Sequence, residues 1–265
     1  MTLPVPERLT FNCTADGSRW PYLLQTPEGE PQAILLNLHG HYADECQMMT
    51  EEIYDDAFGS LRRECLRRNW VSVTAWYGGN SWMGPLAEAG MVDLIGVLRE
   101  RWPQAPLYLQ GGSMGGSSAL VLAVRQPQLL SGVAAFCPAA DVEGFYHWAL
   151  GRAPRNPTLR NVTDAIRIHY TVEGHDLENE LQARSALRHA EALTMPLYLS
   201  HGAKDALVPV RWTRQLVERL GKLGPPPVYD ELPNGDHDAP VRQADWGRVF
   251  DVLTASIPSP RGASL

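Results

Sequence analysis

Five residues, Gly111-Gly-Ser-Met-Gly115, stand between an apolar run that ends at Gln110 and a helix-like stretch that begins at Ser117. In a Gly-x-Ser-x-Gly pattern, the glycines on either side of the serine let a strand and the following helix approach each other closely. The serine takes a strained backbone conformation that exposes its hydroxyl above the sheet edge. The pentapeptide therefore predicts a strand, a tight turn and a helix, with Ser113 as candidate nucleophile and the helix start as an anion site.

The rest of the chain alternates between apolar runs and segments with helical spacing. An Asp-Gly turn at residues 16–17 separates two runs and predicts an antiparallel hairpin over 8–15 and 20–27. The later runs are almost continuously apolar, as in strands that helices cover on both faces. These runs are residues 33–38, 70–75, 107–109, 132–137, 197–199 and 228–232. The covering helices are expected over a stripe from Ile53 to Cys65 that includes Tyr54, around 94–98, and over 207–223 and 241–253. The pattern predicts an α/β fold with a mostly parallel sheet of about eight strands.

Residues 141–191 interrupt this alternation and predict an inserted, cap-like segment over the carboxyl ends of the strands. Ligands of open α/β sheets bind at that edge, so Phe145, Tyr146 and Trp148 are candidates to line a pocket, or else ordinary buried aromatics. Trp82 lies on the loop after the fourth strand, where it could stack on a sugar or an aromatic acid or pack beneath the turn. We expect Tyr42, on an earlier loop, to contact substrate as well.

Composition excludes several classes of partner. The 265 residues suit one domain spanning 1–265, and the formal net charge of −7 lacks the basic clusters that nucleic acid and anionic membranes require. No signal-like start and no apolar run long enough to span a bilayer are present, and the four scattered cysteines suggest buried thiols in a reducing compartment. We therefore expect a cytoplasmic protein that acts on a small neutral molecule without a cofactor. A secreted chain whose signal had been removed would look the same, and a homo-oligomer stays open.

A serine nucleophile needs a base within hydrogen-bond reach and a carboxylate that orients the base. On a doubly wound sheet the acid and the base follow the serine on loops after later strands, in the order acid and then histidine. Asp205 ends the loop after the strand at 197–199, and His237 lies in the turn-rich loop after 228–232. Ser113, His237 and Asp205 are thus the predicted catalytic residues. Asp236 and Asp238 rank lower because adjacent residues cannot easily fold back onto the imidazole of His237.

The other histidines suggest different roles. His147, His169, His175 and His189 lie in or beside the insertion and are interpreted as surface residues. His201 follows a strand and is expected to have a structural role near the site.

Acyl transfer also requires N–H donors for the negative charge that develops on the attacked carbonyl oxygen. One is the N–H of Met114, directly after the nucleophile, and the other is expected from His41 or Tyr42 on the loop after the strand at 33–38. A competing hypothesis makes His39 and His41 a pair of metal ligands, with Asp44 and Glu45 close by. It leaves the serine turn, Asp205 and His237 unexplained, so no metal site is predicted.

These motifs together resemble the α/β-hydrolase superfamily, and specifically lone catalytic domains of prolyl-oligopeptidase-like esterases. The match rests on His39-Gly40, on Gly111–Gly116, and on residues 184–205 with the later Gly235-Asp-His237. The resemblance implies a triad of Ser113, Asp205 and His237 and an eight-stranded sheet. It also implies a serine carboxylesterase that hydrolyses small acyl esters, including acetyl or feruloyl esters of carbohydrates. The alternative is a peptidase or amidase with the same triad, although this chain lacks the propeller that oligopeptidases of the family carry.

Overall fold

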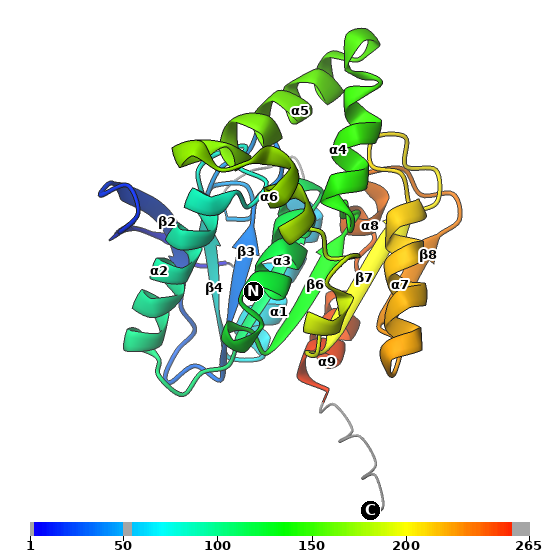
Figure 1. The fold of residues 1–265 in the computed structure, drawn as a ribbon. Coiled ribbons are helices and arrows are strands. Elements are labelled where there is room, and N and C mark those ends of the chain that lie inside the picture. Colours follow the sequence, from blue (N-terminus) through cyan, green and yellow to red (C-terminus); the bar gives the residue numbers. More distant parts are fainter. Residues whose placement is uncertain (1–2, 50–54, 256–265) are drawn as a thin grey trace, which may run out of the picture.

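The computed structural model describes residues 3–49 and 55–255. Within these residues the strands form one eight-stranded sheet in the order β1-β2-β4-β3-β5-β6-β7-β8 (Figure 1). Strand β2 pairs antiparallel with β1 and β4, whereas the remaining neighbours are parallel. The bounds are β1 Glu7–Asn12, β2 Arg19–Gln25, β3 Ala33–Leu38, β4 Trp70–Ala75, β5 Leu107–Gly112, β6 Gly132–Phe136, β7 Leu197–Gly202 and β8 Val228–Leu232. The sheet confirms the predicted fold.

Two strands continue beyond the apolar runs from which they were predicted, residues 107–109 and 197–199. Strand β5 continues to Gly112 and β7 to Gly202, through residues that strand preferences disfavour. The reason at Gly202 is close approach, since a Cβ there would lie 2.2 Å from the carbonyl oxygen of Asp236. Glycine at this strand end lets the loop of the expected base pass directly over β7.

Helices cover both faces of the sheet and bury two apolar cores. Helices α1, α8 and α9 lie on one face and α2, α3 and α7 on the other (Figure 1). Their bounds are α1 Asp55–Arg67, α2 Pro85–Arg101, α3 Met114–Arg125, α7 Arg211–Leu223, α8 Ala239–Arg242 and α9 Trp246–Thr254. Short 3-10 turns span Pro127–Leu129, Ala153–Arg155, Val172–Gly174 and Ala190–Ala192. No helix in the described ranges has the length and apolar character to cross a membrane.

Three predicted helices differ from the structure at their ends. The single helix expected over 241–253 is wrong, because Asp245 caps α9 by accepting the N–H of Arg248 and so separates it from α8. The helix expected from residue 207 begins only at Arg211. The first helix was expected to include Ile53 and Tyr54, which lie outside the described residues.

The segment from 141 to 191 folds mainly into the helices α4 Val142–Leu150, α5 Pro157–Tyr170 and α6 Leu177–Ala183. These helices lie over the carboxyl ends of the strands (Figure 1). Two buried contacts hold the segment to the loop after β4: the Tyr170 hydroxyl donates to the Trp82 carbonyl at 2.8 Å, and Arg184 donates to the Met83 carbonyl at 3.0 Å. The interpretation of residues 1–265 as a single domain stays a prediction.

Candidate active site

Ser113 occupies the turn between β5 and α3 in the strained conformation that the sequence predicted, with φ 56° and ψ −120°. The surrounding glycines allow this geometry. A Cβ on Gly115 would lie 2.1 Å from the carbonyl oxygen of Leu38, and one on Gly111 would lie 2.4 Å from the backbone of Gly115. Any larger residue at either position would force β3, β5 and α3 apart, so the turn requires glycine for steric reasons.

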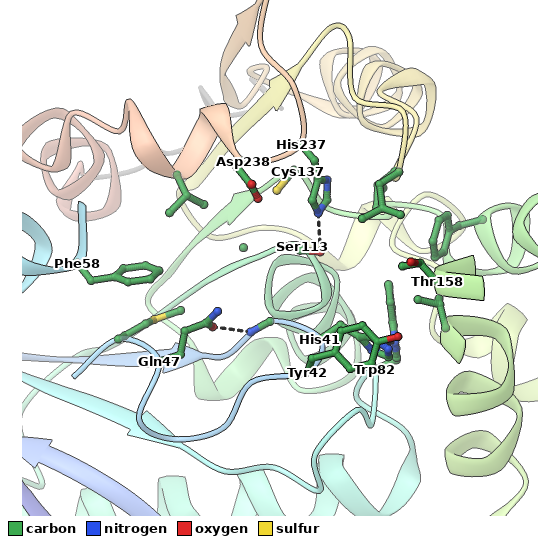
Figure 2. Close-up of a pocket in the computed structure, with 18 residues that line it drawn as sticks. His41, Tyr42, Gln47, Phe58, Trp82, Ser113, Cys137, Thr158, His237 and Asp238 are labelled. Atoms are coloured by element: carbon green, nitrogen blue, oxygen red, sulfur yellow. Dashed lines mark hydrogen bonds between the residues drawn. The ribbon is translucent and has the colours of Figure 1, made fainter. Parts of the chain in front are cut away.

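The structure brings the three predicted catalytic side chains together. His237 Nε2 lies 2.8 Å from Ser113 Oγ, and His237 Nδ1 lies 2.6 Å from Asp205 Oδ2. Figure 2 shows the imidazole above the serine hydroxyl. Because the carboxylate accepts the Nδ1 proton, Nε2 is left to accept the proton of the serine hydroxyl. This arrangement, called the triad below, is suited to nucleophilic attack by Ser113.

Asp205 is buried and richly hydrogen bonded. Its Oδ1 accepts the backbone N–H groups of Leu207 and Val208 at 2.9 and 2.8 Å, which is why this stretch is not yet helical. Burial alone would raise the pKa of the carboxyl, but hydrogen bonds from His201 and His237 hold that pKa well below its usual value. The carboxylate therefore stays ionised and fixed against the imidazole. His201 is fully buried against it, in agreement with its expected structural role.

The loop after β3 offers one backbone donor to the site. The N–H of Gly40 donates to Gln47 Oε1 and that of Tyr42 to Asn80 Oδ1, each at 2.7 Å. Between them, the His41 N–H has no acceptor among the residues that the structure describes. These contacts therefore favour the predicted donor His41 over its alternative Tyr42 as the partner of the Met114 N–H at the start of α3. The anion-binding role of both groups stays a prediction.

The imidazole of His41 is itself held in place. Its Nδ1 accepts the Trp82 indole N–H at 3.2 Å, and its Nε2 donates to Asn161 Oδ1 at 2.8 Å. Burial lowers the pKa of His41, and it lowers that of His39 to about 4, so both rings favour the neutral form. The described residues contain no group of three or more His, Cys, Asp or Glu that could hold a metal ion. His41 instead contacts Trp82 and Asn161 through its two ring nitrogens, and His39 Nδ1 lies 2.9 Å from the Gly40 carbonyl oxygen.

A pocket of about 210 Å³ opens beside Ser113. Phe58 and Gln47 lie on one side of the serine, and Trp82 and Thr158 lie on the other (Figure 2). The lining comprises Gly40, His41, Tyr42, Gln47, Met48, Phe58, Trp82, Gly112, Ser113, Cys137, Phe145, Thr158, Val162, Leu207, Val208, His237, Asp238 and Val241. The two sides belong to the cores on opposite faces of the sheet, so the pocket passes across the carboxyl ends of the strands.

The predicted substrate-binding aromatics divide into two groups. Tyr42 and Trp82 line the pocket, whereas Tyr146 and Trp148 do not. Successive residues of a helix point about 100° apart, so α4 turns Phe145 toward the pocket and buries Tyr146 elsewhere. Trp148 lies one turn further along, against Trp212. Phe145, rather than Tyr146 or Trp148, therefore lines this pocket, and substrate contact by Tyr146 and Trp148 stays a prediction.

Several lining residues carried no signal in the sequence. Gln47 and Met48 lie on the loop after β3 and Phe58 lies in α1, and Met48 Sδ accepts a hydrogen bond from the side chain of Gln110 in β5. Asn80 does not line the pocket, but it holds the loop after β3 by accepting the Tyr42 N–H. Side-chain amides that bind loop backbone have no periodicity or spacing, so a single sequence does not reveal them.

A sequence profile of the prolyl oligopeptidase family matches residues 103–250, which is more than half of the chain and includes Ser113, Asp205 and His237. The chain belongs to the prolyl oligopeptidase family. It is a serine hydrolase with the α/β-hydrolase fold.

Solved structures share the fold of this family member. Acylaminoacyl peptidase from Pyrococcus horikoshii has a TM-score of 0.68 at 15% identity, over 95% of this chain and 40% of that chain. The fluorophosphonate-binding serine hydrolase F from Staphylococcus aureus has a TM-score of 0.69 at 16% identity, over 94% of this chain and 98% of that chain. An esterase from Pyrococcus furiosus has a TM-score of 0.68 at 14% identity, over 94% and 91%. The family member thus spans less than half of the first protein and nearly all of the other two.

Proposed function

We propose that this family member is a serine carboxylesterase that hydrolyses short acyl esters through an acyl-enzyme on Ser113. The observation that carries the proposal is the hydrogen-bonded triad at the floor of a small pocket. At about 210 Å³ the pocket is smaller than the roughly 300–1,000 Å³ typical of sites for drug-sized ligands. A short acyl chain fits such a space better than a long one.

The reaction follows from the geometry of the triad. His237 Nε2 takes the hydroxyl proton as Ser113 Oγ attacks the ester carbonyl carbon. The N–H groups of Met114 and His41 bind the oxygen that becomes negative. His237 then returns the proton to the departing alcohol oxygen, which leaves an acyl group on the serine. Water, activated by the same imidazole, attacks this acyl-enzyme, releases the acid and restores the hydroxyl.

Within the short acyl esters, we propose a narrower class of natural substrate. Acetyl or feruloyl esters of carbohydrates are the candidates, and Trp82 would contact the aromatic or sugar part. Trp82 is only 2% exposed and stacks on Phe145 with ring centroids 5.4 Å apart. Because both faces of the indole are largely covered, Trp82 would contact the substrate as part of the pocket wall and would not stack on it. Such a contact suits a compact acyl group.

The same triad could cleave an amide, and the similarity of fold to acylaminoacyl peptidase motivates that alternative. Initial rates on 4-nitrophenyl acetate, butyrate and octanoate, compared with those on peptide 4-nitroanilides, separate the two. We expect the short esters to give the highest kcat/KM and the anilides to give little turnover. A higher kcat/KM on anilides than on every ester would make the chain a peptidase or amidase instead.

A further inference from the structure

A second hollow, of about 280 Å³, adjoins the active-site pocket on the side of Thr158. We call it the outer groove; it is lined by Trp148, Gly151, Arg152, Arg155, Asn156, Leu159 and Ala206. None of its lining residues takes part in the catalytic steps described above. Its composition differs from that of the pocket, because two arginines and no carboxylate belong to its lining.

Residues that are neighbours in the chain line the pocket and the outer groove. Thr158 lines the pocket and Leu159 the groove, while Leu207 lines the pocket and Ala206 the groove. Consecutive Cα atoms are about 3.8 Å apart, so at both places the two spaces are separated by roughly one residue. The outer groove therefore lies close to the active-site pocket, on the side of Thr158 and Leu207.

The arginines of the groove pair with no carboxylate in the described part of the chain. Arg152 stacks over the Trp148 ring, with the guanidinium carbon 4.5 Å from the centroid, and donates to the Trp148 carbonyl. Arg155 is exposed, and neither arginine forms an ion pair with any residue that the structure describes. Elsewhere on the surface, arginines such as Arg214 and Arg188 pair with glutamates at 2.6 and 2.7 Å. Two unneutralised cations beside the active site are notable in a chain of net charge −7.

From this placement we propose that the outer groove binds an anionic group of the substrate, a carboxylate or a phosphate, attached a few bonds from the scissile ester. The proposal rests on the esterase function proposed above. Arg152 is the better ordered of the two cations, because stacking on the indole removes part of its side-chain freedom before the ligand arrives. Arg155 supplies a second charge on the same side. The expected substrates are thus short esters of dicarboxylic acids or of acidic alcohols.

The expected gain in kcat/KM is modest because the groove is open to solvent. Exposed ion pairs are weak, so two arginines together should favour an anionic ester over its neutral counterpart by about threefold to tenfold. Salt should reduce this preference, since the Debye length falls to about 3 Å at 1 M ionic strength.

Two pairs of substrates test the proposal and locate the anion. The first pair is mono-4-nitrophenyl adipate and its methyl ester, with the charge on the acyl part. The second is the butyryl ester of 4-hydroxybenzoate and that of methyl 4-hydroxybenzoate, with the charge on the alcohol. We expect one pair to show the preference in the wild-type enzyme. R155E should reverse the preference, and R152Q should reduce it.

Arg101 offers a matched control. Its guanidinium also stacks over an indole, that of Trp102, with the guanidinium carbon 4.6 Å from the ring centroid, but it lies at the end of α2 that precedes β5, at the opposite edge of the sheet. R101Q should keep the wild-type preference. Equal kcat/KM within both pairs, or a preference that R155E and R152Q leave intact, would overturn the anion site while leaving the esterase proposal standing. Absence of Ser113-dependent turnover on all four esters would instead refute the esterase proposal and the anion site with it.

Discussion

Replacing Asn80 with alanine tests whether the loop that carries the His41 N–H is held in place for catalysis. Asn80 Oδ1 accepts the Tyr42 N–H at 2.7 Å, one residue from the expected donor. Tyr42 has φ 69°, a conformation that costs of order 1 kcal/mol for a residue with a side chain. Without the asparagine the loop is free to relax, and the His41 N–H moves away from the position where the oxyanion forms.

Two energies set an upper and a lower limit on the effect of N80A on kcat. Losing a donor of this kind outright costs about 2.7–4 kcal/mol in the barrier. The hydrogen bond of Asn80 itself contributes about 1 kcal/mol, and Gln47 still holds the other side of the loop through Gly40. N80A should therefore lower kcat about fivefold to tenfold. The KM should change little, because the developing negative charge exists mainly in the transition state.

Steady-state kinetics on 4-nitrophenyl acetate, with melting temperatures of the same preparations, provide the measurement. N69A is the control, because the Asn69 side chain also binds backbone, donating to the Glu30 carbonyl, but at the amino end of β4, away from the site. It should lower the melting temperature and leave kcat unaffected. The reasoning fails if N80A keeps wild-type kcat, or if its only effect is on KM.

Three further predictions concern the turn, the neighbouring histidine and the acid. G115A places a methyl group 2.1 Å from the Leu38 carbonyl oxygen and should lower the free energy of unfolding by about 1–3 kcal/mol, measured by urea denaturation; unchanged stability would contradict the steric argument. His39 has a folded-state pKa of about 4 against 6.5 in the unfolded chain, so its neutral form contributes stability above pH 6.5 that is lost as pH falls toward 4, by about 3 kcal/mol. The unfolding free energy of H39N should therefore change less between pH 6.5 and 4 than that of the wild type. An equal change with pH in the two proteins would refute the lowered pKa of His39. D205N should lower kcat by about 10⁴, since the amide does not enforce the tautomer of His237 that Ser113 needs, and retention of more than a tenth of the activity would show that another group orients the imidazole.

The triad could be predicted from sequence because strand topology restricts where its members lie. Asp205 follows the buried strand β7 and His237 follows the half-buried edge strand β8, and the carboxyl ends of these parallel strands lie at one edge beside Ser113. Strand topology does not determine in the same way which residues form the walls of the pocket. The orientation of α4 about its axis decides that Phe145 faces the pocket while Tyr146 does not, and that orientation depends on packing against helices distant in sequence.

The break between α8 and α9 also could not be predicted from the apolar pattern of the sequence. The boundary between α8 and α9 depends on the side chain of Asp245 accepting a backbone N–H, a local interaction that competes with continued helix. The apolar pattern over 241–253 does not reveal it, because Val249 and Leu253 are buried by the same core with or without the break.

The most direct test of the account is the mass of the protein after treatment with a serine-reactive fluorophosphonate, read together with hydrolysis of 4-nitrophenyl acetate. We predict one adduct, located by peptide mapping on Ser113, and complete loss of hydrolysis in proportion to labelling. S113A should neither take up the reagent nor turn over the ester. Labelling at another residue, or an S113A protein with wild-type turnover, would contradict the central claim that Ser113 is the nucleophile.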